Sequence, residues 1–140
     1  MKTKTITLVG SMRFSNHFQS IASRIEKWHL YTADAWVILY PIIDERGLNK
    51  EELMDIHRHK IDRADSIIVV DVDGYVGEST REEITYALTR GKKVESWLLI
   101  TKGGCCCDRD MQTCLGCEFR KSYQKKWKRL LVECSNQETT

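Results

Sequence analysis

The chain has 140 residues, of which 41% are hydrophobic and 30% charged, and its formal net charge is +2. This length is most simply one domain with a real hydrophobic core, so we expect a single domain over residues 1–140. The small net charge gives no global electrostatic reason to bind nucleic acid, and no apolar run is long enough to span a membrane. With no long apolar segment near the start, a cytoplasmic protein is expected.

Strand-like and helix-like segments alternate along the first half of the chain. Residues 6–9 predict a strand, and apolar residues at helical spacing over 14–28 predict a helix. A second strand is expected over 35–40, ended by Pro41, which cannot continue a central ladder. A second helix is expected over 49–64, with Asn49 as its N-cap.

The same alternation continues in the second half. A short β-branched run over 66–71 predicts a buried strand, and a helix over 79–90, which Ser79 or Thr80 can cap, is expected to end at Gly91. A fourth strand is expected over 94–100. This order predicts an α/β fold with a right-handed parallel sheet of about four to five strands flanked by helices. The core covers about residues 5–100, followed by a cysteine-rich loop over 103–117 and a C-terminal helix over about 118–134.

Polar residues are most concentrated just after the third predicted strand. Asp71 and Asp73 follow its end, two glycines allow close backbone approach, and several glutamates open the next helix. In open α/β sheets, ligands bind at the carboxyl ends of the strands, so this segment is a candidate rim. Helical phase turns Glu83 toward the cleft and Glu82 toward solvent. The ordinary alternative is turn-forming aspartates and glutamates that serve the helix dipole.

The loop after the first predicted strand is the second candidate site. It consists of Gly10, Ser11, Met12 and Arg13. Free backbone N–H groups, a hydroxyl and a guanidinium at a helix N-terminus suit a phosphate or carboxylate. The loop has neither the dinucleotide-binding glycine fingerprint nor a P-loop, and an ordinary turn with a cap is the simpler interpretation.

Four motifs occur together in a definite order: Gly10-Ser-Met-Arg13, Ala64-Asp65, Gly74-Tyr-Val-Gly77 and Glu83-Ile-Thr-Tyr-Ala87. This order resembles the nucleoside 2-deoxyribosyltransferase superfamily, which also contains the deoxynucleoside monophosphate N-glycosidases. The resemblance covers roughly residues 5–100. It implies a Rossmann-like or flavodoxin-like sheet and assembly of the chain as a homodimer or larger oligomer.

The resemblance also implies an activity at the anomeric carbon of a nucleoside or nucleoside 5′-monophosphate. Breaking an N-glycosidic bond develops oxocarbenium character, which Glu83 would stabilise or trap covalently. Asp71 or Asp73 would protonate the leaving base. Water as acceptor gives hydrolysis, a second base gives transfer, and neither reaction requires a cofactor.

The same resemblance assigns binding roles at the two loops. In the monophosphate-acting members the first-strand loop holds the 5′-phosphate, which implies Ser11 and Arg13. The remaining candidates at these loops are Gly10, Met12, Gly77, Ser79 and Thr80.

His57 marks a departure from the family pattern. It lies eight residues before Asp65, where the N-glycosidase branch has an aspartate. Imidazole can replace a carboxyl group as a proton donor, and an ordinary surface histidine is the alternative.

The cysteine-rich loop suggests a metal site. Cys114 and Cys117 have the spacing of a zinc knuckle, and Cys105 with Cys107 would complete four thiolates. Four thiolates leave no open coordination position, so such a zinc would be structural. An unmetallated lid loop and a redox-sensitive loop are the alternatives.

The C-terminal helix carries a run of cations over 120–129, interleaved with Tyr123 and Trp127. The aromatic residues keep helical phase, which favours a solvated basic face on a helix that packs against the sheet. Three functions therefore remain: an N-glycosidic enzyme, a nucleotide-binding or sequestering protein without turnover, and, as the weakest, a nucleic-acid-associated protein that uses the cysteine loop and this helix.

Overall fold

The computed structural model describes residues 3–27, 35–41, 47–101 and 115–136. Within these ranges the strands are β1 (Thr3–Val9), β2 (Ala35–Leu39), β3 (Ser66–Val69) and β4 (Lys93–Ser96). They form one all-parallel sheet in the order β2-β1-β3-β4. This is the order of the first four strands of flavodoxin-like sheets, and the predicted Rossmann-like α/β class is confirmed.

Helices follow each strand. They are α1 (Ser15–Glu26), α2 (Lys50–Arg63), α3 (Glu78–Thr89), α4 (Trp97–Thr101) and α5 (Leu115–Asn136), with short 3₁₀ turns η1 (Met12–Phe14) and η3 (Val72–Gly74). None of these helices combines the length and the apolar character that a membrane crossing requires.

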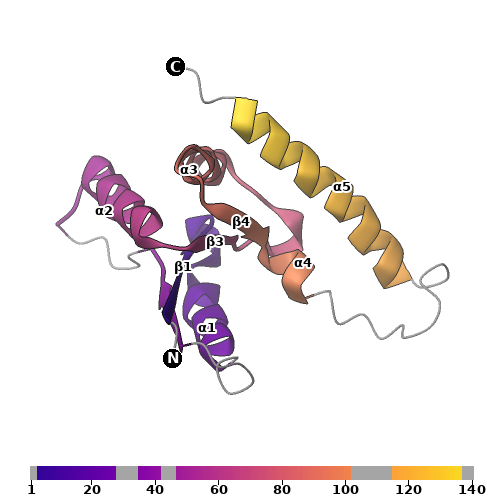
Figure 1. Cartoon of the computed structure of the whole chain (residues 1–140), viewed down its shortest axis with the longest axis horizontal. Coiled ribbons are helices and arrows are strands. Elements are labelled where there is room, and N and C mark those ends of the chain that lie inside the picture. The colour runs from indigo at the N-terminus through magenta and orange to yellow at the C-terminus, as the bar shows by residue number, and fades with distance from the viewer. Residues whose placement is uncertain (1–2, 28–34, 42–46, 102–114, 137–140) are drawn as a thin grey trace.

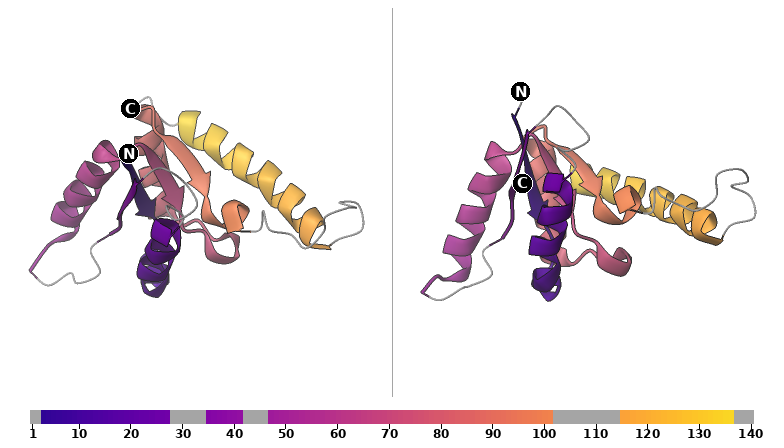
Figure 2. Two further views of the ribbon diagram at one scale, coloured as in Figure 1. Left: turned by 60° about the horizontal axis from the view of Figure 1, so that its bottom comes forward. Right: turned by 90° about the horizontal axis from the view of Figure 1, so that it is seen from below.

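Two hydrophobic cores lie on opposite faces of the sheet. One unites strand residues with α1 and Trp97 of α4, and the other unites them with α2, α3 and α5. In Figure 1, α2, α3 and α5 lie above the sheet and α1 lies below it, and Figure 2 shows α2 and α5 on opposite sides of the molecule. The helices on both faces explain why β2 and β3 are largely apolar.

The alternation of side chains along β1 connects the two cores. Ile6 and Leu8 pack toward α1, whereas Val9 packs in the core of α2, α3 and α5. Thr7 is fully buried, and its hydroxyl donates a 2.7 Å hydrogen bond to the backbone carbonyl of Lys60 in α2. The period of two expected for a strand therefore holds, and the buried polar side chain of β1 is satisfied by a helix carbonyl.

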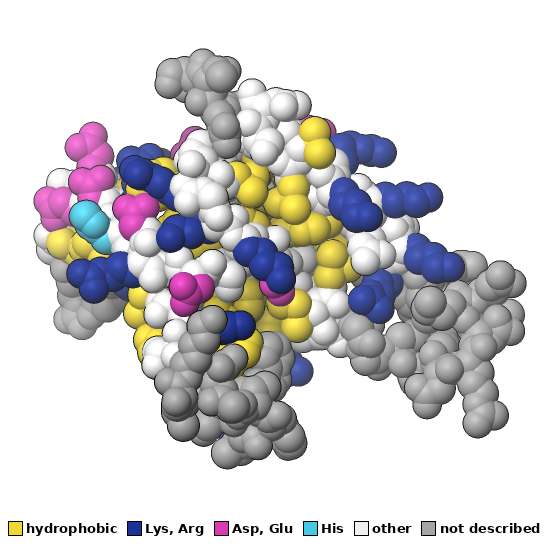
Figure 3. Space-filling view, in the orientation of Figure 1, with side chains coloured by type: hydrophobic (Ala, Val, Ile, Leu, Met, Phe, Trp, Pro, Cys, Tyr) yellow, Lys and Arg dark blue, Asp and Glu magenta, His cyan; other side chains and the backbone are white. Residues whose placement is uncertain are grey.

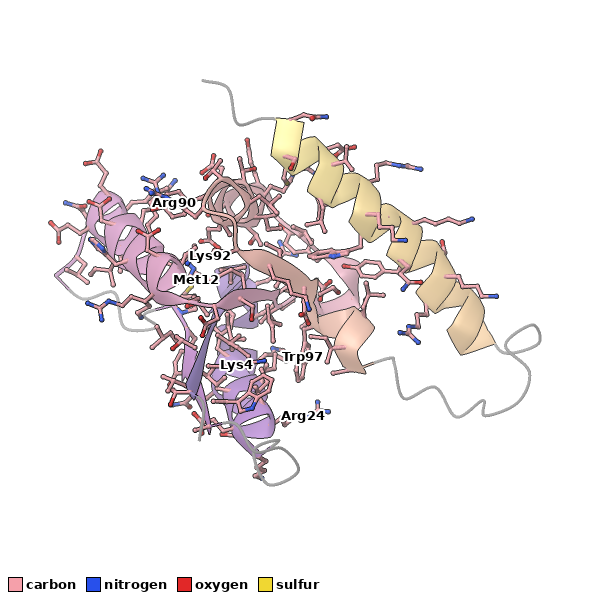
Figure 4. All side chains as sticks on the ribbon, viewed as in Figure 1. Lys4, Met12, Arg24, Arg90, Lys92 and Trp97 are labelled. Carbon is pink, nitrogen blue, oxygen red and sulfur yellow. The ribbon has the colours of Figure 1, made fainter. Side chains whose placement is uncertain are left out.

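Ion pairs and cation–π contacts tie neighbouring helices together (Figure 4). The Arg24 guanidinium of α1 lies 5.1 Å from the Trp97 ring centroid, across the face that α1 and α4 share. After α3, the Lys92 amine donates to the Asp62 carbonyl at 3.0 Å, and Arg90 Nε lies 3.6 Å from the Asp62 carboxylate. These contacts fasten the end of α3 to α2 and so hold the two helices side by side.

Two predicted helix boundaries are confirmed. Asn49 is the N-cap of α2: its side-chain oxygen accepts the Glu52 backbone N–H at 2.8 Å, and its amide donates to the Glu52 carboxylate at 2.9 Å. Beyond α3, Gly91 has φ +72°, the left-handed conformation that favours glycine after a helix.

Two other boundary predictions are wrong. The N-cap of α3 is Gly77, without a side-chain cap, so Ser79 and Thr80 lie inside the first turn. The fourth strand ends at Ser96 and the chain turns into α4, although its apolar residues suit a strand. The reason is tertiary: the Asp71 carboxylate accepts the Leu98 N–H at 2.9 Å and the Ser96 hydroxyl accepts the next N–H at 3.2 Å, which satisfies the start of a helix.

Candidate functional site

The loops after β1 and β3 leave the sheet toward opposite faces, which makes the carboxyl edge between these strands a topological switch point. A cleft of about 530 Å³ lies at this edge between α2 and α3, and we call it the α2–α3 cleft. Its lining comprises Gly10, Ser11, Met12, Pro41, Leu48, Lys50, Leu53, Met54, Ile56, His57, Lys60, Tyr75, Gly77, Glu78, Ser79, Thr80 and Glu83. Both predicted loops therefore contribute to one cavity.

The loop after β1 is shaped by close packing. A Cβ atom on Gly10 would lie 3.0 Å from the Val70 carbonyl oxygen, so only glycine lets β1 pass β3 this closely. Ser11 then starts η1, where its hydroxyl accepts the Arg13 backbone N–H at 3.3 Å. Met12, labelled in Figure 4, is 41% exposed. Gly10, Ser11 and Met12, which are binding candidates predicted from the sequence, all line the cleft.

The first turn of α3 forms the opposite wall. Gly77, Ser79 and Thr80 all line the cleft, and Thr80 is buried. The backbone N–H groups at the start of a helix have no partners within the helix, and the helix dipole makes this end electropositive. This wall is therefore suited to an anionic group, as the sequence predicts for these three residues.

Glu83 and His57 face each other across the cleft from α3 and α2. His57 Nε2 lies 3.6 Å from Glu83 Oε2, and the side chains are 9% and 23% exposed. Neither imidazole nitrogen nor this carboxylate oxygen has a hydrogen-bond partner among the described residues. Glu82, one residue earlier, is exposed and does not line the cleft. Buried polar atoms of this kind are normally satisfied, so the pair has hydrogen-bonding capacity to offer a bound molecule.

Lys60 is a residue of the cleft that sequence reasoning missed. Its amine donates a 2.7 Å hydrogen bond to the carbonyl of Tyr40, the residue after β2. Burial lowers the pKa of this amine from its ordinary value. Lys50 lines the same cleft from the start of α2. Helical spacing could have indicated this position, because Lys60 follows His57 by about one turn and so lies on the same face of α2.

Arg13 does not line the cleft. Its guanidinium carbon lies 3.8 Å from the centroid of the Tyr75 ring, in a cation–π contact, and Tyr75 is the lining residue. Tyr75 also meets the Phe14 ring edge-to-face, with centroids 6.0 Å apart. Arg13 therefore contributes by holding a wall of the cleft.

Neither candidate aspartate lies in the cleft. Asp71 is fully buried, and its carboxylate accepts hydrogen bonds from the Ser96 hydroxyl, the Tyr123 hydroxyl and the Leu98 N–H. The pKa of Tyr123 is raised, mainly by burial and secondly by the hydrogen bond to this carboxylate. Asp73 is exposed on η3, with φ 56°. Asp71 thus joins β3, α4 and α5, away from Glu83.

The predicted zinc ligands Cys105, Cys107 and Cys114 lie outside the described residues, as does the side chain of Cys117. The zinc site therefore stays a prediction. Among the described residues, no group of three or more His, Cys, Asp or Glu is arranged to hold a metal ion. Cys134 of α5 is buried, with its sulfur 3.8 Å from the Arg81 carbonyl oxygen.

The α2–α3 cleft brings together two carboxylates, Glu78 and Glu83, with an imidazole, a helix N-terminus and two amines. A carboxylate beside an imidazole can act as a nucleophile with a proton donor or acceptor. The amines and the helix N-terminus favour an anionic ligand. No protein-family model, curated protein or solved structure matches this chain.

Proposed function

We propose that the α2–α3 cleft cleaves or exchanges the N-glycosidic bond of a (deoxy)nucleoside or nucleoside 5′-monophosphate. The observation that carries the proposal is the pair of Glu83 and His57, 3.6 Å apart and without other partners among the described residues. Reaction at an anomeric carbon needs a carboxylate on one side and a proton donor for the leaving group. The resemblance in motif order supports the same chemistry.

Each step uses these two side chains. A Glu83 oxygen forms a bond to C1′ while the bond from C1′ to the base nitrogen breaks, and the electron pair leaves with the base. Protonated His57 donates the proton that neutralises the base. Water or a second base then attacks C1′, gives its proton to His57 and releases the Glu83 carboxylate. Water yields hydrolysis, and a second base yields transfer.

The cationic parts of the cleft suit the 5′-phosphate of a monophosphate. The Lys60 amine gives one hydrogen bond to the Tyr40 carbonyl and can donate its remaining protons into the cleft. Lys50, the loop at Ser11 and the first turn of α3 line the same space. We therefore expect 5′-monophosphates to bind more tightly than nucleosides.

The test is to incubate the protein with a panel of nucleosides and 5′-monophosphates and to measure free base by chromatography. Glu83→Gln keeps the size of the side chain and removes its charge, so base release should fall by about 10³-fold or more. Glu82→Gln makes the same change at the exposed neighbour and should leave the rate unchanged. Equal rates in the two variants would refute the role of Glu83.

One observation favours a second function, nucleotide binding without turnover. The buried carboxylate of Asp71 is held by three partners outside the cleft, so it cannot protonate a leaving base. A cleft that kept its anion-binding walls but lost efficient proton donation would bind nucleotides and release them intact. Calorimetric binding of 5′-monophosphates, with no free base from any member of the panel, would select this function.

A further inference from the structure

A second cavity, of about 420 Å³, lies along α5, and we call it the α5 groove. Its walls come from residues 74–76, from Arg81 of α3 and from one face of α5. The Tyr75 ring lines both this groove and the α2–α3 cleft. The groove is thus adjacent to the candidate site but is built from different residues, and its volume is in the range of ligand-binding pockets.

The floor of the α5 groove is aromatic and firmly held. The Tyr123 and Trp127 rings stack with centroids 6.5 Å apart and planes inclined by 29°. The Tyr123 hydroxyl is anchored to the buried Asp71 carboxylate. A Cβ atom on Gly74, which has φ +80°, would lie 3.3 Å from the Tyr123 ring, so η3 packs directly against α5. The two rings are only 7% and 6% exposed, so the floor is a fixed apolar base beneath the more exposed Tyr75 ring.

The rim of the groove is cationic. Lys126, Arg129 and Arg81 contribute, and the one lining carboxylate, Glu133, is already paired with Arg81 at 2.8 Å. Over residues 120–136, α5 carries six Lys or Arg residues and one acidic residue. Figure 3 shows Lys and Arg side chains gathered over α5, next to apolar side chains. The remaining positive charge faces solvent beside the aromatic floor.

We propose that the α5 groove binds single-stranded nucleic acid. Bases would stack on the Tyr75 ring, which is 39% exposed, while phosphates would meet Lys126 and Arg129. Lys121, Lys125 and Lys128 of α5 are exposed but do not line the groove, so they lie outside the proposed site. An acidic peptide would use the cations of the rim but would not stack on the Tyr75 ring. The proposal does not depend on catalysis at Glu83.

The experiment measures binding of a fluorescein-labelled oligothymidylate of about 12 nucleotides by fluorescence anisotropy at low salt. The double variant Lys126→Glu with Arg129→Glu removes the cations of the rim and should weaken binding by about tenfold or more. The matched control, Lys125→Glu with Lys128→Glu, makes the same change of charge on the same helix outside the groove. It should weaken binding by less than about threefold. Thermal unfolding checks that both variants remain folded.

Three results would overturn the proposal: no binding by the unaltered protein, equal weakening in the two double variants, or equal affinity for polyphosphate or polyglutamate of matched charge. The last two would mean diffuse electrostatic attraction without stacking on the Tyr75 ring. Base release from nucleosides is measured separately on the same proteins. Neither pair of residues lines the α2–α3 cleft, so this activity should not change, and failure of one proposal is distinguishable from failure of the other.

Discussion

The side chains of His57 and Glu83 meet at 3.6 Å although they are 26 positions apart in the chain. Each belongs to a helix whose other residues pack against the sheet, so the positions of both are set by the core. Ile61 lies one helical turn after His57, and Ile84 directly follows Glu83; both are fully buried. A pair of side chains on rigid helices holds its geometry better than a pair on loops. The proposed transfer of a proton to a departing base would depend on such a fixed geometry.

The proposed role of His57 as proton donor predicts a dependence on the leaving group. His57→Gln should slow the release of an ordinary base by about 100-fold, because the base must leave as an unprotonated anion. Release of 4-nitrophenolate from a 4-nitrophenyl deoxyriboside needs no proton and should change by less than about threefold. Initial rates with both substrates measure the effect.

His59→Gln is the matched control, because His59 is exposed and does not line the cleft. It should leave both rates unaltered. If His57→Gln slowed both substrates equally, the imidazole would be acting on the shape of the cleft and not as an acid.

At the scale of elements, the two helices that form the cleft begin in different ways. Asn49 precedes α2 with extended backbone and accepts the Glu52 N–H. Gly77 precedes α3 and gives no side-chain cap, and residues of this first turn line the cleft. The same sequence logic predicted a side-chain cap for both helices, and only α2 has one. An uncapped helix start at a cleft is available to a ligand.

This difference predicts two unequal losses of stability. Asn49→Ala should lower the free energy of unfolding by about 1 kcal/mol, because it removes the cap of α2. Ser79→Ala should change it by less than about 0.5 kcal/mol, because the hydroxyl caps nothing. Urea unfolding followed by circular dichroism compares the two. A loss for Ser79→Ala as large as that for Asn49→Ala would contradict the observed start of α3.

At the scale of the whole molecule, Asp71 connects three elements that are distant in sequence. Its carboxylate at the end of β3 accepts bonds from Ser96 and Leu98 around the start of α4, and from Tyr123 in α5. The fully buried carboxylate is stabilised only while these donors are present. The network therefore fixes α5 against the sheet and, through Tyr123, forms the floor of the α5 groove.

Loss of one donor should destabilise the fold. Tyr123→Phe should lower the free energy of unfolding by about 1.5–3 kcal/mol, the cost of losing a hydrogen bond to a buried charge. Tyr86→Phe is the control, because the Tyr86 hydroxyl also donates to an aspartate, Asp62, but at the surface. Its effect should stay below about 1 kcal/mol. Equal losses would mean that the Asp71 network adds no stability.

The network also predicts a dependence on pH. The pKa of Tyr123 is raised in the folded protein, so the folded state keeps a proton that the unfolded state loses. This stabilisation is fully present below about pH 10 and is lost as the pH rises toward the folded-state pKa. In urea unfolding at a series of alkaline pH values, Tyr123→Phe should lose less stability than the unaltered protein above this pH. Tyr86→Phe should keep the steep loss that Tyr123 causes.

Local patterns in the sequence were enough to predict the four strands and the helices α1, α2, α3 and α5 in their order, the parallel α/β class, the cap at Asn49 and the glycine that follows α3. They also predicted that two loops and Glu83 would meet at one edge of the sheet. These features follow from periodicity, from backbone preferences of single residues and from the rule that parallel strands end on the same side. Each of these signals is carried by residues that lie close together in the sequence.

Tertiary structure alone determined which hydrogen-bond partners and neighbours the polar side chains have. Asp71 accepts a hydrogen bond from Tyr123, 52 positions away, and lies outside the cleft, and it also accepts the Leu98 N–H where β4 gives way to α4. His57 and Lys60 entered the cleft because α2 packs beside α3. A carboxylate or an amine looks the same in a sequence whether it is buried or free, because the energy of burying it depends on donors and acceptors brought close only by the folded chain.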